Sequence, residues 1–213
     1  STSLIQSAMP ANPAGLRPVY FFVSGGGEST EVALKQVLED QVQKWDYRRL
    51  RAEKKKRVKS FPPIFVLIAN GELHWTTHIF IGLNGAKKPM LWSMNSMKKL
   101  WSEVTKYLKK FMGEQAKEHE IRQEQFGHQK DYYACGYFSI LYALLFAMFS
   151  RWRSNKPKTD KVFFQIVDKY VQLMQKEGLF DVFKSFVRVV AYEKSPKKSD
   201  DNMAQFIESQ LGV

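Results

Sequence analysis

The sequence predicts an α+β fold, with a small central mixed or antiparallel sheet flanked by helices. The composition supports a buried core, because 44% of the 213 residues are hydrophobic and 25% are charged. Between residues 60 and 95, β-rich apolar stretches alternate with Asn-Gly pairs. In several other stretches, apolar residues recur every three to four positions, which is typical of amphipathic helices.

Residues 1–17 are predicted to form a flexible arm, and residues 18–213 a single domain. At the start of this domain, Pro18–Val23 has the composition of a short strand. The stretch from about Thr30 to Trp45 has helical periodicity. The glycines between the two lack the Gly-Lys-Ser/Thr ending of a phosphate-binding loop, so a plain connecting loop is expected.

The core of the domain is predicted over about residues 60–150. Three β-rich stretches open it, joined by Asn-Gly turns into an antiparallel meander. The stretches are Ile64–Ala69, Leu73–Leu83 and Pro89–Met94, with turns at Asn70-Gly71 and Asn84-Gly85. A helix over Ser96–Met112 and a weaker strand over His119–Phe126 are expected to follow.

A helical C-terminal extension is predicted over residues 160–213. Apolar residues lie at helical spacing in three stretches, Asp160–Lys176, Leu179–Tyr192 and Asp201–Leu211.

Tyr132–Phe149 contains no charged residue over 18 positions, which is near the lower length limit for crossing a membrane. The stretch also contains Gly136 and Ser139 and opens with a tyrosine pair. We therefore expect a helix buried inside a globular domain, and the protein is not predicted to be an integral membrane protein.

The chain is strongly basic, with 33 Lys and Arg against 21 Asp and Glu, a net charge of +12. The densest block is Lys44–Lys59, with nine basic and two acidic residues. Such a block favours contact with a polyanion, either nucleic acid or an inositol phosphate, although a solvated helix face has the same composition. The one cysteine forms no disulfide within these residues, which fits an intracellular location in cytoplasm or nucleus.

Cys135 is the residue around which the predicted chemistry is built. It begins the apolar stretch, so its thiol is expected at a helix N-terminus, where the dipole and unpaired amides favour a thiolate. A structural, inert cysteine is the alternative. Gln129, six residues earlier, could place its side-chain amide beside the Cys135 amide as an oxyanion hole.

His74 and Asn95 complete the candidate site. They lie on neighbouring predicted strands, where the amide could orient the imidazole and leave its other nitrogen facing the thiol. Trp75 could roof a narrow channel that admits residues without side chains. His78 lies on the same strand face and could replace His74 as the base. His74 and His78 could also bind a metal, but no third ligand lies nearby, and no cofactor is predicted. His119 and His128 are expected on surface loops.

In their order along the chain, His74, Asn95, Gln129 and Cys135 resemble the SUMO-protease-like (ubiquitin-like protease) superfamily. That superfamily includes adenovirus-type and African-swine-fever-type viral proteases and bacterial effector deubiquitinases. The resemblance rests on three stretches: Ile64-Phe-Val-Leu-Ile leading into His74-Trp75, Trp92-Ser-Met-Asn95-Ser96, and Gln129 with five residues before Cys135-Gly136. Papain-like enzymes share the chemistry, but their cysteine precedes their histidine.

The resemblance implies a thiol protease or isopeptidase that cleaves after a Gly-Gly-type sequence. Its partner would be ubiquitin, a ubiquitin-like protein or a polyprotein. The chain departs from the family in having Asn95 where an acid is usual and Ala134 before the cysteine. It also lacks an upstream Trp-Leu-Asn-Asp-type segment. Two alternatives stay open: an effector-type acetyltransferase using the same Cys135, and a non-catalytic basic binding module in which Cys135 is inert.

Overall fold

The structure, a computed structural model, describes residues 19–24, 29–42, 61–71, 73–98, 103–151 and 160–192. Three of the predicted segments lie outside these residues: the arm over residues 1–17, the basic block Lys44–Lys59, and the short helix Asp201–Leu211. The division into a core over about residues 60–150 and an extension over residues 160–213 stays a prediction.

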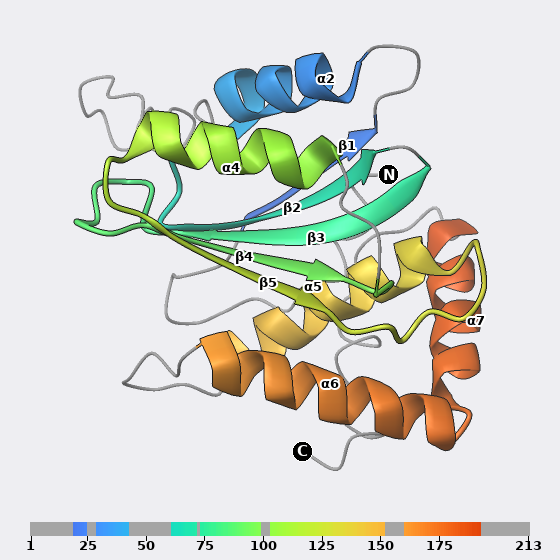
Figure 1. Ribbon diagram of the computed structural model, residues 1–213. Helices are drawn as coiled ribbons and strands as arrows, with labels where there is room; N and C mark the ends of the chain where they lie inside the picture. The colour runs from blue at the N-terminus through green and yellow to red at the C-terminus, as the bar shows by residue number, and fades with distance from the viewer. Residues whose placement is uncertain are drawn as a thin grey trace, which may run out of the picture.

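A five-stranded sheet lies at the centre of the described residues, in the order β1-β2-β3-β4-β5 (Figure 1). The middle strands β2, β3 and β4 pair antiparallel, as the predicted meander requires. The outer strands pair parallel, β1 with β2 and β5 with β4, so the sheet is mixed. The strands are β1 (Val19–Ser24), β2 (Ile64–Gly71), β3 (His74–Ile81), β4 (Met90–Asn95) and β5 (Glu120–Gln125).

Helices cover both faces of the sheet, which confirms the predicted α+β class (Figure 1). On one face lie α2 (Thr30–Gln36), its π-helical continuation η1 (Val37–Val42), and α4 (Glu103–Gln115). On the other face lie α5 (Cys135–Arg151), α6 (Asp160–Lys176) and α7 (Leu179–Tyr192).

Each face of the sheet has its own apolar core, and β2 contributes to both. Phe65 and Leu67 pack toward α2 and α4, whereas Val66 and Ile68 pack toward α5. All four are almost fully buried, and a strand covered on both faces needs apolar residues at successive positions. This explains why the stretch reads as a continuous apolar run instead of an alternating one.

Helix α5 is the central helix of the lower layer, packed between the sheet and α6 and α7. The side-chain hydroxyl of Thr77 on β3 donates to the backbone oxygen of Ser139, 2.8 Å away, and so holds the helix on the sheet. The buried helix predicted from the uncharged stretch is therefore confirmed. Among the described residues, no helix combines the length and hydropathy needed to cross a bilayer.

The hairpin between β2 and β3 turns two residues later than predicted. Gly71 still pairs with His74, so the chain reverses between these two residues and not at Asn70-Gly71. Leu73 has a φ of 66°, a left-handed conformation that is uncommon for a residue with a side chain. Gly71 is glycine for a different reason: a Cβ there would lie 2.6 Å from Cγ2 of Val104 on α4.

Candidate active site

His74 is the first residue of β3, and its imidazole contacts the last residue of β4. Its Nε2 atom lies 2.8 Å from Oδ1 of Asn95. The same Oδ1 accepts the backbone N–H of Met97 at 2.9 Å, which identifies this atom as the amide oxygen. An oxygen can only accept here, so Nε2 of His74 must carry the proton. Asn95 thereby leaves Nδ1 as the basic nitrogen.

The thiol of Cys135 forms a hydrogen bond with the His74 ring at the start of α5. Burial alone would raise the pKa of Cys135, but His74 and the backbone N–H groups of Trp75 and Gly136 lower it overall. Burial likewise opposes a charged His74, yet the bonds to Cys135 and Asn95 leave the pKa of His74 raised. The two shifts together favour a thiolate–imidazolium pair.

Asp131 caps the turn that leads into α5. Its Oδ1 accepts the backbone N–H groups of Tyr133 at 3.0 Å and Ala134 at 2.7 Å, as an N-cap carboxylate does. The cap stops one residue short of Cys135, so the carboxylate does not use the Cys135 amide. Cys135 is the first residue of α5, where the helix dipole favours negative charge on its thiol.

Gln129 is buried in the loop between β5 and α5. Its Nε2 donates to the backbone oxygen of Asp131 at 2.7 Å, and its Oε1 accepts from Oγ of Ser96 at 2.7 Å. Because a carbonyl oxygen only accepts, the first bond fixes which end of the amide is nitrogen. One N–H of that nitrogen is used, and the second can serve a ligand. Asp131 thus joins the Gln129 amide to the start of α5.

Trp75 lies over the beginning of α5. A Cβ built on Gly136 would be 3.6 Å from Cδ1 of the indole, in ordinary contact. The indole is half-buried, and the tryptophan backbone N–H contacts the thiol sulfur. Trp75 therefore combines a backbone role at Cys135 with a side chain beside the helix start.

His78, the alternative to His74, belongs to the interior of the sheet. It is fully buried, with Nε2 2.8 Å from Oγ1 of Thr76 and Nδ1 2.8 Å from Oγ of Ser93. Burial lowers the pKa of His78 to about 3, so the ring stays neutral. Both nitrogens are engaged away from Cys135, and the structure places His74 at the thiol.

His128 was predicted on the surface, and that prediction is wrong. The ring is 4% exposed, stacked on Phe126 at 4.7 Å between centroids. Its Nδ1 lies 2.9 Å from the hydroxyl of Tyr142, and its Nε2 lies 2.7 Å from Oδ1 of Asp168. Asp168 is on α6, 40 residues further along the chain. A partner so distant in sequence leaves no local pattern that could have revealed the burial.

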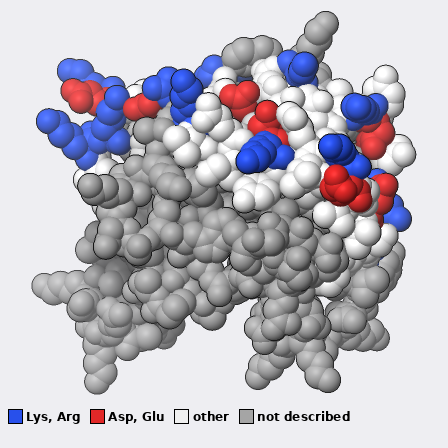
Figure 2. All heavy atoms as spheres, turned by 90° about the horizontal axis from the view of Figure 1, so that it is seen from below, with Lys and Arg blue, Asp and Glu red and all other residues white. Residues whose placement is uncertain are grey.

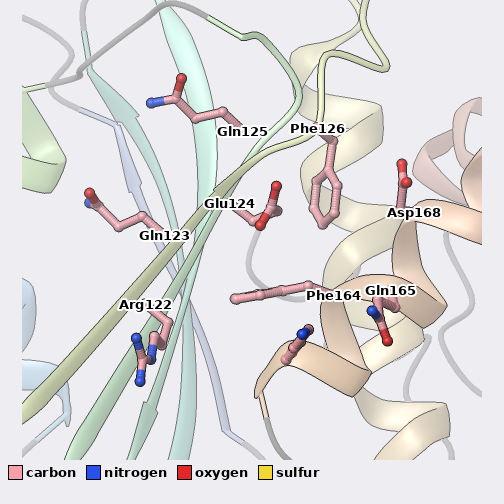
Figure 3. A pocket seen from close by; sticks show the side chains of 9 residues that line it. Arg122, Gln123, Glu124, Gln125, Phe126, Phe164, Gln165 and Asp168 are labelled. Atoms are coloured by element: carbon pink, nitrogen blue, oxygen red, sulfur yellow. The ribbon is translucent and has the colours of Figure 1, made fainter.

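A groove of about 710 Å³ runs between β5, the last strand of the described sheet, and α6. Figure 3 shows Glu124 and Phe126 pointing toward α6, which contributes Phe164 and Asp168. Burial, with the charge of Asp168, raises the pKa of Glu124. Asp168 therefore has two surroundings, the groove on one side and His128 on the other.

The described part of the surface shows no separate basic patch on the face in Figure 2, where Lys and Arg lie among Asp and Glu. The block that carried the polyanion prediction, Lys44–Lys59, lies outside the described residues. Contact with a polyanion stays a prediction.

Of the predicted site residues, the structure brings His74, Asn95 and Cys135 into direct contact and places Trp75 beside them. Gln129 is joined to the start of α5 through Asp131. Sequence reasoning missed Asp131 and Ser96. An acidic residue just before a predicted helix is an N-cap signal and could have identified Asp131. Nothing in the sequence pairs Ser96 with Gln129.

No protein-family profile and no curated protein matches this sequence. Solved structures do resemble it. A de-sumoylating protease is 14% identical with a TM-score of 0.49, and the match covers 96% of this chain and 85% of that one. The ASFV pS273R protease is 13% identical with a TM-score of 0.40, covering 70% and 59%. The Xanthomonas campestris effector protein XopD, bound to ubiquitin, is 12% identical with a TM-score of 0.40, covering 79% and 89%.

At identities of 12–14% and TM-scores below 0.5, these likenesses say nothing of the reaction or the substrate of this chain. The chemistry of the site therefore stands on its own residues.

Proposed function

We propose that this protein is a thiol-dependent protease or isopeptidase that acts through Cys135. The observation that carries the proposal is the bonding of His74, with Nε2 fixed on Asn95 and the other side of the ring bonded to a thiol of lowered pKa. A merely structural cysteine needs no such base. Conversion of thiol to thiolate is the step that activates a cysteine for attack on a carbonyl.

In this mechanism the Cys135 thiolate attacks the scissile carbonyl carbon, and the carbonyl oxygen becomes an anion. The second N–H of Gln129 and the Cys135 amide hold that anion, and one such donor contributes about 3 kcal/mol. The His74 imidazolium gives its proton to the leaving amine as the C–N bond breaks. It then takes a proton from water, whose oxygen attacks the thioester carbon; the C–S bond breaks, releasing the carboxylic acid and regenerating the thiolate–imidazolium pair.

The preferred substrate is an extended chain ending in Gly-Gly, carried by ubiquitin, a ubiquitin-like protein or a polyprotein. Support comes from Trp75, whose indole lies 3.6 Å from a Cβ built on Gly136, the residue after Cys135. We expect this indole to narrow the approach to the thiol, where residues without side chains fit best. We expect the activity inside a cell, because reducing surroundings keep a reactive thiol from being oxidised.

The test is a panel of ubiquitin and ubiquitin-like proteins, each with a propargyl or vinyl electrophile at its C-terminus. We expect at least one to add to the wild-type protein and none to add to Cys135→Ala, with the adduct read by intact mass. Thermal unfolding of both proteins controls for folding. Labelling that is unchanged without Cys135 would rule out the mechanism. Acetyl transfer from labelled coenzyme A, with no probe adduct, would instead select the acetyltransferase.

A further inference from the structure

The loop between β5 and α5 contains a buried histidine that the mechanism does not use. His128 immediately precedes Gln129, and its ring spans two helices, α5 through Tyr142 and α6 through Asp168. Its other neighbours are Phe126, stacked within 7° of parallel, and the ring of Phe138. A surface loop residue has no need of so many fixed contacts.

The hydrogen bonds of this ring are satisfied by one protonation state. A carboxylate accepts, so Nε2 of His128 donates to Asp168, and Nδ1 accepts from the hydroxyl of Tyr142. The pKa of His128 is lowered by burial, against the opposing effect of Asp168, so the neutral ring prevails near neutral pH. The two hydrogen bonds together fix the orientation of the His128 ring.

The backbone on either side of the ring is held as well. The carbonyl of His128 accepts from Nε2 of Gln175 on α6 at 2.8 Å. The next amide, that of Gln129, donates to the backbone oxygen of Ser96 at 3.0 Å. The peptide between His128 and Gln129 is therefore fixed between α6 and the end of β4, which sets the point from which the Gln129 side chain starts.

We propose that His128 is a positioning residue for the oxyanion donor. Held by Asp168 and Tyr142, it keeps the Gln129 side chain where its second Nε2 N–H can donate to the oxyanion. This inference rests on the proposed function of Gln129. His128 touches neither substrate nor thiol, and acts through its neighbour. A misplacement of about 1 Å in a catalytic group can cost about 100-fold in rate, so a clamp of this kind has a measurable effect.

The experiment measures kcat and KM on a fluorogenic peptide amide ending in Gly-Gly, for wild type, His128→Ala, His128→Gln, Gln129→Ala and the double variant His128→Ala/Gln129→Ala. Gln129→Ala should lower kcat about 100-fold through loss of one oxyanion donor. His128→Ala should lower kcat about tenfold and change KM less than twofold. His128→Gln should recover most of the loss, because its amide can accept from Tyr142 and donate to Asp168.

The double variant gives the decisive result. If His128 acts through Gln129, the double variant is as slow as Gln129→Ala alone, within about threefold. Losses that multiply to about 1,000-fold would show that His128 acts independently, and the proposal would be overturned. Asp168→Ala provides a second route should His128→Ala fold poorly. The Asp168 side chain is 43% exposed, and its removal should cost severalfold in kcat by the same coupling.

Two further measurements separate this proposal from the proposed function. Alkylation of Cys135 by iodoacetamide forms no oxyanion, so His128→Ala should leave its rate within about twofold. Hydrogen exchange of residues 126–134 should rise in His128→Ala while that of α6 stays constant. Unchanged exchange overturns the clamp whether or not the wild-type protein turns over substrate. A wild type without turnover, but with the expected exchange, refutes only the proposed function.

Discussion

Two imidazoles in this molecule are bonded in the same way, in two regions with different tasks. His74 and His128 both place Nε2 2.7–2.8 Å from a side-chain oxygen, and both turn Nδ1 toward a weakly acidic group. At His74 that group is the Cys135 thiol, whose pKa is lowered. At His128 it is the hydroxyl of Tyr142, where burial, together with the charge of Asp168, raises the pKa well above its usual value.

The difference lies in what surrounds the acidic group. The sulfur of Cys135 also receives backbone N–H groups from Trp75 and Gly136, at the N-terminus of a helix. The Tyr142 hydroxyl is buried in the core and faces a carboxylate's charge. An imidazole beside an acidic group is therefore not enough to create a nucleophile. Hydrogen-bond donors must also converge on the acidic group and stabilise its anionic form.

Of the substitutions that test the difference between the two imidazoles, His74→Ala should have the largest effect on activity. Removal of the base and acid of the mechanism should lower kcat/KM about 1,000-fold. The matched control is Tyr142→Phe, which removes the acidic group at the other ring and should cost only a few-fold. Both are measured with the Gly-Gly amide substrate. A loss below tenfold in His74→Ala would mean that His74 is not the base.

A second effect concerns the stability that the buried rings confer. His78 has a pKa of about 3 when folded, below its ordinary value of 6.5, so the unfolded chain binds more protons between these values. The free energy of unfolding should therefore fall as pH decreases below about 6.5, by about 2 kcal/mol between pH 7 and pH 5. The lowered pKa of His128 acts in the same direction, and the raised pKa of His74 in the opposite one.

Urea unfolding at both pH values measures this dependence. In His78→Gln the amide does not titrate, so the difference between pH 7 and pH 5 should shrink, with the remainder due largely to His128. A variant that keeps the whole pH dependence of the wild type would show that His78 is not its source.

The smallest effect tests how Asn95 tunes the active centre. Its bond contributes to the raised pKa of His74, so Asn95→Ala should weaken the imidazolium and shift the pH midpoint of Cys135 alkylation upward. A shift of about one pH unit corresponds to about tenfold in the rate at a pH below both midpoints. Asn95→Asp should shift the midpoint downward, because a carboxylate accepts the same bond with a full charge. Midpoints that move in the same direction in both variants would contradict this role.

Much of the fold could be predicted because its signals are local. The apolar run of β2, the helical spacing of α4, α6 and α7, and the uncharged stretch of α5 each lie within one element. The sequence predicts the hairpin, but with its turn at Asn70-Gly71. Gly71 is instead required because Val104, on a helix 33 positions later, leaves no space for a side chain. In sequence, a glycine required by packing looks the same as a glycine required by a turn.

The candidate site shows the same contrast between local signals and contacts that are distant in sequence. His74, Asn95, Gln129 and Cys135 were found because their residue types and order suit one reaction. The contacts that hold them were not found. Ser96 bonds to Gln129 across 33 positions, and Asp168 to His128 across 40. Such pairs are set by how helices pack on the sheet, and no spacing rule in the sequence contains that information.

The close approach at Gly71 has a consequence for how this molecule would lose its activity. Gly71 is the strand partner of His74, and Val104 of α4 occupies the space where a side chain would be. The position of the imidazole thus depends on a helix that contributes nothing to the chemistry. Substitutions that loosen α4 would therefore disturb His74 through Gly71, as well as the apolar core that α4 shares with β2.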